Sequence, residues 1–133
     1  MSRDRRVLLV AMSGVRVRHE RLLEEGMTLP GFVERGRTIA SLPSLSLLTL
    51  ASLCPPDWRP DYRELDELPR GAAEAIAAEG YDLVALSSFT ARILETYALA
   101  DALRAAGVPV ALGGLHVSAL PEEAAAHADA VVV

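Results

Sequence analysis

The sequence is poor in cysteine, in aromatic residues and in long apolar runs, and each shortage excludes a class of protein. Cys54 is the single cysteine among 133 residues, so this chain forms no internal disulfide and no metal site built from cysteines alone. Aromatic residues make up 5% of the chain and hydrophobic residues 51%, so the core must be aliphatic. No run approaches the roughly 20 apolar residues of a membrane span, and residues 7–12 are too short for a signal peptide. We expect a cytoplasmic protein without a membrane partner.

The charge balance argues against a nucleic-acid partner. The formal net charge is -5, whereas binding to phosphate backbones relies on clustered positive charge. The arginines near the amino terminus are scattered along the chain, which is typical of a solvated surface.

Several familiar site motifs are also absent. No G-x-G-x-x-G or G-x-x-x-x-G-K-[ST] sequence occurs, which argues against the common dinucleotide and phosphate loops. A phosphoacceptor domain would need acidic residues where this chain has Met12-Ser13 and Ser87-Ser88. The sequence also shows no pair of catalytic residues, so nothing in it supports an enzyme that acts alone.

Apolar runs of strand length alternate with helical patterns along the chain. Residues 13–42 are irregular and form a long connection. The remaining elements predicted are strands at 7–11, 61–65, 81–87, 108–112 and 130–133, and helices at 42–53, 69–79, 91–106 and 121–127. Such alternation favours an α/β domain with a doubly wound, five-strand parallel sheet. The charged strand 61–65 suits an edge position.

Three predicted loops follow strands and lie at the carboxyl edge of the sheet, where open parallel sheets bind ligands. Their small hydroxyl and glycine residues offer polar atoms and close backbone approach. The loops are Met12-Ser13-Gly14, Ser87-Ser88-Phe89-Thr90 and Gly113-Gly114-Leu115-His116. The ordinary alternative is that these are turn residues and that Ser88 or Thr90 caps the next helix.

The histidines do not suggest a metal site. His19 lacks the second histidine of a zinc helix. His127 lies near a predicted helix end, where a surface residue would complement the helix dipole. His116 lies in the third loop and could contact a ligand.

Five segments carry a resemblance to a known family. They are SLPSLSLLTLA at 41–51, YDLVALSSFT at 81–90, GVPVALGGLH at 107–116, ALPEEA at 119–124 and HADAVVV at 127–133. Together they resemble the amino-terminal cobalamin-binding domain of radical S-adenosylmethionine enzymes. The resemblance implies a flavodoxin-like (Rossmann-like) sheet of strand order 2-1-3-4-5, with a corrinoid over the strand ends.

The resemblance also implies which residues bind the cofactor. The sequence lacks the D-x-H-x-x-G motif of histidine-ligated cobalamin proteins, so we expect binding without a histidine on cobalt and assign neither His116 nor His19 as a ligand. The cofactor residues expected are Ser13, Gly14, Ser87, Ser88, Phe89, Thr90, Gly113, Gly114, Leu115 and His116.

The chain lacks the C-x-x-x-C-x-x-C motif that such enzymes use for a 4Fe-4S cluster and S-adenosylmethionine. We therefore expect residues 1–133 to be a truncated amino-terminal domain, with the radical domain after residue 133 as its partner. The parent would be a methyltransferase or a rearranging or cyclising enzyme. The alternative is an interaction or scaffold domain that binds no cofactor.

Overall fold

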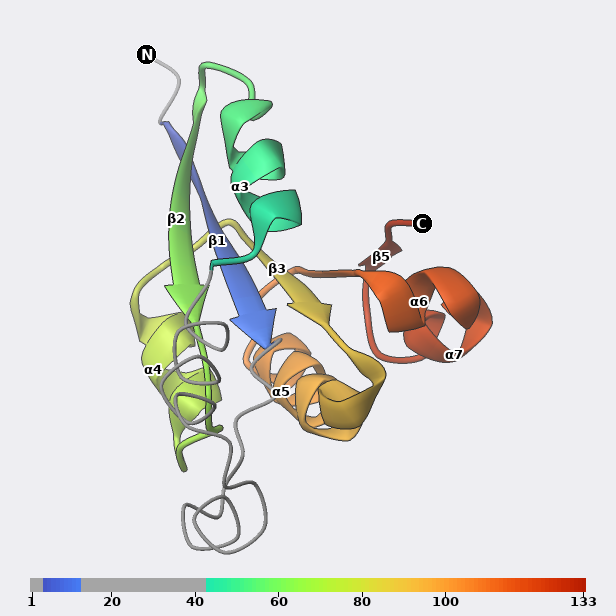
Figure 1. Cartoon of the computed structure of the whole chain (residues 1–133). Coiled ribbons are helices and arrows are strands. Elements are labelled where there is room, and N and C mark those ends of the chain that lie inside the picture. Colours follow the sequence, from blue (N-terminus) through green and yellow to red (C-terminus); the bar gives the residue numbers. More distant parts are fainter. Residues whose placement is uncertain (1–3, 13–42) are drawn as a thin grey trace, which may run out of the picture.

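The structure, a computed structural model, describes residues 4–12 and 43–133. A parallel sheet of five strands in the order β2-β1-β3-β4-β5 organises this part of the chain (Figure 1). In chain order the elements are β1 (Arg5–Met12), α3 (Leu45–Ser52), β2 (Trp58–Glu64), α4 (Ala72–Ala78), β3 (Leu83–Ser88), the 3-10 turn η1 (Thr90–Arg92), α5 (Ile93–Ala105), β4 (Val110–Gly113), α6 (Leu115–Ala119), α7 (Pro121–Ala125) and β5 (Ala130–Val131). The predicted flavodoxin-like α/β fold and its strand order are confirmed.

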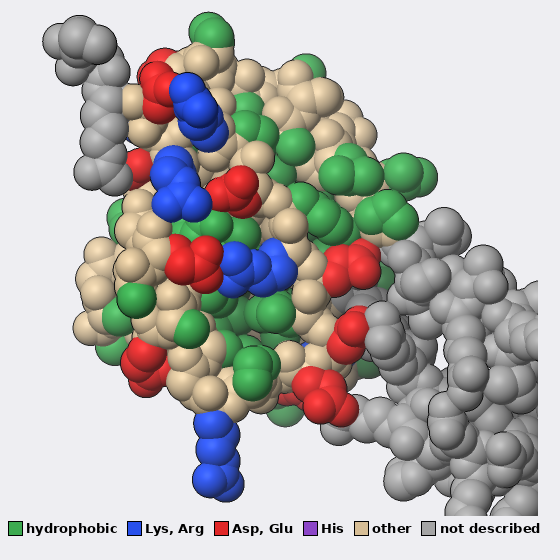
Figure 2. Space-filling model, turned by 90° about the vertical axis from the view of Figure 1, so that its left-hand side faces the viewer, with side chains coloured by type: hydrophobic (Ala, Val, Ile, Leu, Met, Phe, Trp, Pro, Cys, Tyr) green, Lys and Arg blue, Asp and Glu red, His purple; other side chains and the backbone are tan. Residues whose placement is uncertain are grey.

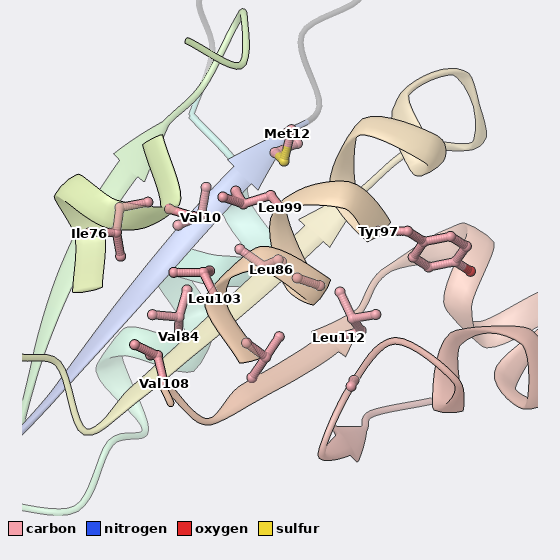
Figure 3. Packing of buried hydrophobic residues seen from close by; sticks show 14 of the residues in the cluster. Val10, Met12, Ile76, Val84, Leu86, Tyr97, Leu99, Leu103, Val108 and Leu112 are labelled. Carbon is pink, nitrogen blue, oxygen red and sulfur yellow. The ribbon is translucent and has the colours of Figure 1, made fainter. Parts of the chain in front are cut away.

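Helices lie on both faces of the sheet, because side chains alternate along each strand. In β1, Leu8, Val10 and Met12 join the larger core with residues of α4, α5, α6 and α7. Figure 3 shows this aliphatic packing, with Leu99 and Leu103 of α5 over the sheet. The other face of β1 packs on α3 through Leu47. The core is aliphatic, as the composition requires.

Most predicted boundaries differ from the structure by a few residues. β2 begins at Trp58 and includes Pro60, which fits an edge strand because proline cannot donate to a second neighbour. Pro43 lies outside α3, where Ser44 is the N-cap and accepts from the Leu47 amide. The short helix α6 was not predicted. Residues 13–42, with Ser13, Gly14 and His19, lie outside the described residues.

Ion pairs cover the exposed edge of β2 (Figure 2). Arg6 of β1 pairs with Asp61 of β2 at 3.0 Å, and Arg63 pairs with Glu79 after α4 at 2.9 Å. Arg59 lies against Asp4 in the same way. Charged side chains at an unpaired edge oppose pairing with further strands.

Two aspartates close the amino-terminal edge of the sheet. The Asp82 carboxylate accepts a hydrogen bond from the Arg6 amide at 2.8 Å, and the Asp82 amide donates to the Arg6 carbonyl at 2.9 Å. Asp129 makes the same pair of bonds with Val110, at 2.8 and 2.9 Å. Both aspartates thus bind backbone groups at the amino edge, whereas open parallel sheets bind ligands at the carboxyl edge.

No helix in the described ranges is long and apolar enough to cross a membrane. The cytoplasmic location expected from the sequence stays a prediction.

Candidate cofactor site at the carboxyl ends of the strands

The strand register brings two of the predicted loops side by side. Met12 at the end of β1 pairs with Ser88 at the end of β3, and Ser87 pairs with Gly113 at the end of β4. The segments that follow β3 and β4 therefore leave the sheet as neighbours. This is the arrangement that the sequence predicts for Ser87 to Thr90 and Gly113 to His116.

Gly114 brings these two segments into direct contact. Its φ of 103° lies in a region that L side chains rarely adopt. A Cβ on Gly114 would lie 2.8 Å from Ser87 Oγ and 3.1 Å from the Ser88 carbonyl oxygen. Both the backbone conformation and the contact require glycine here.

The two serines have different environments. Ser88 is buried, and its hydroxyl donates to the Phe89 carbonyl at 2.9 Å and lies 3.4 Å from the Met12 carbonyl. It therefore stabilises the loop and does not cap the helix as the alternative reading expected. Neither η1 nor α5 has a side-chain N-cap bond. Ser87 and Gly113 are half-buried, so no large side chain stands at these two positions of the carboxyl edge.

His116 is engaged by protein on both ring nitrogens. It lies on α6, with 9% of its surface exposed. Its Nδ1 lies 3.0 Å from Thr90 Oγ1, and its Nε2 lies 3.2 Å from Glu123 Oε1 on α7. The hydrogen bond from His116 lowers the pKa of Glu123. His116 thus ties both loops to α7.

Exposed apolar side chains flank these small residues. Phe89 is 42% exposed and Leu115 is 73% exposed, on the two loops that Gly114 joins. The described residues of the predicted site include no acid, lysine or arginine. The strand-end surface, defined as Ser87, Phe89, Thr90, Gly113 and Leu115, is therefore uncharged, polar at its hydroxyls and apolar at its flanks.

Two contributors near this surface were missed by sequence reasoning. Glu123 follows His116 across two short helices, so no single helical period relates them. Tyr97 of α5 points toward α6 and α7 (Figure 3), with its ring edge-on to His116 at 6.4 Å. His127 is not the simple surface residue expected, because its ring stacks on Tyr97 at 4.1 Å and its Nδ1 bonds Asp101 at 2.9 Å. Such contacts across elements have no local sequence signal.

A metal site is not formed by the described part of the chain. Within residues 4–12 and 43–133, no group of three or more His, Cys, Asp or Glu side chains could hold an ion. Cys54 is a free, half-buried thiol after α3. Any metal must therefore come with a cofactor or be held by other residues.

The fold and the strand-end surface define a flavodoxin-like domain with its candidate ligand site at the carboxyl edge of a parallel sheet. Comparison with known proteins narrows this class. Residues 40–133 match the family model described as B12 binding domain, so the chain belongs to the B12-binding domain family.

Two relatives are methyltransferases of Chlorobaculum tepidum. The chain is 40% identical to bacteriochlorophyllide d C-8(2)-methyltransferase over 90 residues, which are 67% of this chain and 19% of the relative. It is 31% identical to bacteriochlorophyllide d C-12(1)-methyltransferase over 100 residues, which are 75% of this chain and 21% of that relative. The chain thus spans about a fifth of the length of these relatives.

Proposed function

We propose that this chain is the cobalamin-binding module of a radical S-adenosylmethionine methyltransferase. The observation that carries the proposal is the contact of Gly114 with Ser87 and Ser88, which joins two loops into one uncharged surface at the carboxyl edge. The family match supports a B12 ligand at that edge.

The residues present fit a corrinoid. Its macrocycle is broad and flat, so it needs small, uncharged positions next to its faces and can take apolar contacts at its edges. Ser87, Gly113 and Gly114 provide small, half-buried positions, while Phe89 and Leu115 provide exposed apolar contacts. Ser13 and Gly14, which the resemblance also implies as cofactor residues, lie outside the described residues, and their part in the site stays a prediction.

The cobalt would not be ligated by His116, because Thr90 and Glu123 occupy both of its ring nitrogens. This supports corrinoid binding without a histidine ligand from the segment that follows β4. When bound, the corrinoid supplies a cobalt centre that can carry a methyl group. The residues of this chain would bind and orient the corrinoid, and those of the strand-end surface would contact it without a charged side chain.

The names of the two relatives favour a methyltransferase parent over a rearranging or cyclising one. A 4Fe-4S cluster and S-adenosylmethionine would have to be held outside this chain, because Cys54 is its only cysteine. In this proposal residues 1–133 form one domain, and the radical domain follows them in the parent.

Titration of the chain with hydroxocobalamin tests the proposal through the visible spectrum of the corrinoid. Gly114→Ala should weaken binding at least about tenfold, or ~1.4 kcal/mol, because the new Cβ pushes the two loops apart. Gly107→Ala is the matched control: its φ is also positive, at 82°, but a Cβ there meets nothing within 4 Å. A wild-type chain that neither shifts the spectrum nor retains cobalamin on gel filtration would contradict the proposal.

One observation favours the second candidate, an interaction domain without cofactor. Helix α3 carries no charged residue, and its first residue Leu45 and its C-cap Leu53 are 77% and 72% exposed. Helices that are apolar on several sides are usually covered by other protein. If Gly114→Ala changed only the assembly of the parent protein and not cobalamin binding, this second function would be preferred.

A further inference from the structure

A hydroxyl, an imidazole and a carboxylate form a continuous hydrogen-bonded chain beside the strand-end surface. Thr90 after β3, His116 on α6 and Glu123 on α7 are joined by distances of 3.0 and 3.2 Å. The imidazole is nearly buried, whereas half of the Glu123 side chain and much of Thr90 are exposed. Only Thr90 and Glu123, the two ends of this hydrogen-bonded chain, are therefore open to a ligand or to water.

The charge on Glu123 determines where the protons lie. The pKa of Glu123 is lowered, first by the hydrogen bond from His116, so the carboxylate is ionised and accepts a hydrogen bond. His116 then donates from Nε2 to this carboxylate, and in the neutral form of the ring this leaves Nδ1 as an acceptor. Thr90 consequently donates its hydroxyl proton to Nδ1.

The packing around the imidazole holds this arrangement. Tyr97 meets the His116 ring at an interplanar angle of 71°, and 5% of Tyr97 is exposed. Burial, together with the nearby Glu123 carboxylate, raises the pKa of Tyr97 to about 12. Tyr97 therefore keeps its hydroxyl proton and packs against the imidazole as a neutral side chain.

Once its proton points to His116, the Thr90 oxygen can only accept a further hydrogen bond. We propose that Glu123 and His116 fix the Thr90 hydroxyl as an acceptor that binds an N–H donor of the ligand, for which a primary amide of the corrinoid periphery is the fitting chemical class. The inference rests on the proposed function for its ligand. Thr90 is the contacting residue, and His116 and Glu123 are positioning residues.

The proton arrangement is testable without any ligand. Nitrogen-15 NMR of the histidine rings in the 133-residue chain should show His116 protonated on Nε2 and unprotonated on Nδ1. His127 provides an internal comparison, because its Nδ1 faces the Asp101 carboxylate and should carry the proton. A His116 ring protonated on Nδ1 would overturn the inference, whether or not the chain binds cobalamin.

Binding assays test the acceptor itself. Thr90→Val should weaken hydroxocobalamin binding about fivefold, the size expected for one neutral hydrogen bond, and Thr90→Ser should restore it. Ser118→Ala, which removes an exposed hydroxyl from α6, is the control and should have no effect. For cobyrinic acid, whose peripheral amides are replaced by carboxylates, Thr90→Val should make no difference.

Two further variants separate positioning from contact. His116→Asn can still accept from Thr90, and should bind hydroxocobalamin more tightly than His116→Leu. Glu123→Gln should shift the His116 ring resonances and weaken binding less than Thr90→Val. If Thr90→Val binds hydroxocobalamin as tightly as the wild type, this inference fails alone; if the wild type binds none, the proposed function fails with it.

Discussion

Gly114 and Ser87 are in closer contact than any side chain at position 114 would allow, since a Cβ there would lie 2.8 Å from Ser87 Oγ. This contact places the loops after β3 and β4 against each other and defines the strand-end surface. The same contact leads to the first prediction.

Gly114→Ala should destabilise the chain by roughly 2–4 kcal/mol, because it combines an unfavourable backbone conformation with overpacking. Gly107→Ala carries the backbone cost without the clash and should cost only about 1 kcal/mol. Urea unfolding followed by circular dichroism measures both. Equal losses for the two variants would show that the contact with Ser87 contributes nothing.

The larger core depends on the buried face of α5. Leu103→Ala should cost about 2–5 kcal/mol, because Leu103 is fully buried at 0% exposure and a cavity would remain. Leu94 of the same helix is 79% exposed, and Leu94→Ala should change the free energy of unfolding by less than about 0.5 kcal/mol. Denaturant midpoints of the two variants provide the comparison.

The amino-edge aspartate Asp129 should make stability depend on pH. Its pKa is lowered, first by the hydrogen bond from the Val110 amide and then by Arg104. A carboxyl whose pKa is lower in the folded state stabilises the fold above its unfolded pKa, and this contribution is lost as the pH falls through the folded value. The difference in melting temperature between wild type and Asp129→Asn should thus be present at neutral pH and shrink in acid.

Glu122→Gln serves as the control for this comparison, because it removes an exposed acid of α7. Its melting temperature should differ little from that of the wild type at either pH. A difference for Asp129→Asn that grows in acid would contradict the assigned role of the Val110 hydrogen bond.

The exposed leucines at the two ends of α3, Leu45 and the C-cap Leu53, should matter for association and not for folding. Leu45→Ser and Leu53→Ser remove side chains that are 77% and 72% exposed, so each should change the free energy of unfolding by less than about 0.5 kcal/mol. Leu47→Ser, at 3% exposure, should unfold the chain more easily. If the first two variants destabilise the isolated chain strongly, α3 is not a free surface.

Much of the fold could be predicted because its signals are local. Buried strands such as 81–87 are short apolar runs, and Gly80 and Gly107, with φ of 72° and 82°, mark where α4 and α5 end. Boundaries were less accurate where side chains do not alternate clearly. In β2, the charged residues Asp61 and Arg63 are stabilised by ion pairs with Arg6 of β1 and with Glu79 after α4. Helix α6 was missed because only five residues form it.

The sequence by itself determined the aliphatic α/β sheet, its parallel strands and the neutral, glycine-rich loops at their carboxyl ends, because periodicity and turn chemistry act over a few residues. Only the tertiary structure decided which of those residues meet. It packed Gly114 on Ser87, buried the Ser88 hydroxyl, and joined His116 to Thr90 and Glu123. Such contacts depend on how separate elements pack in space, and the spacing of residues along the sequence does not determine which side chains of different elements come together.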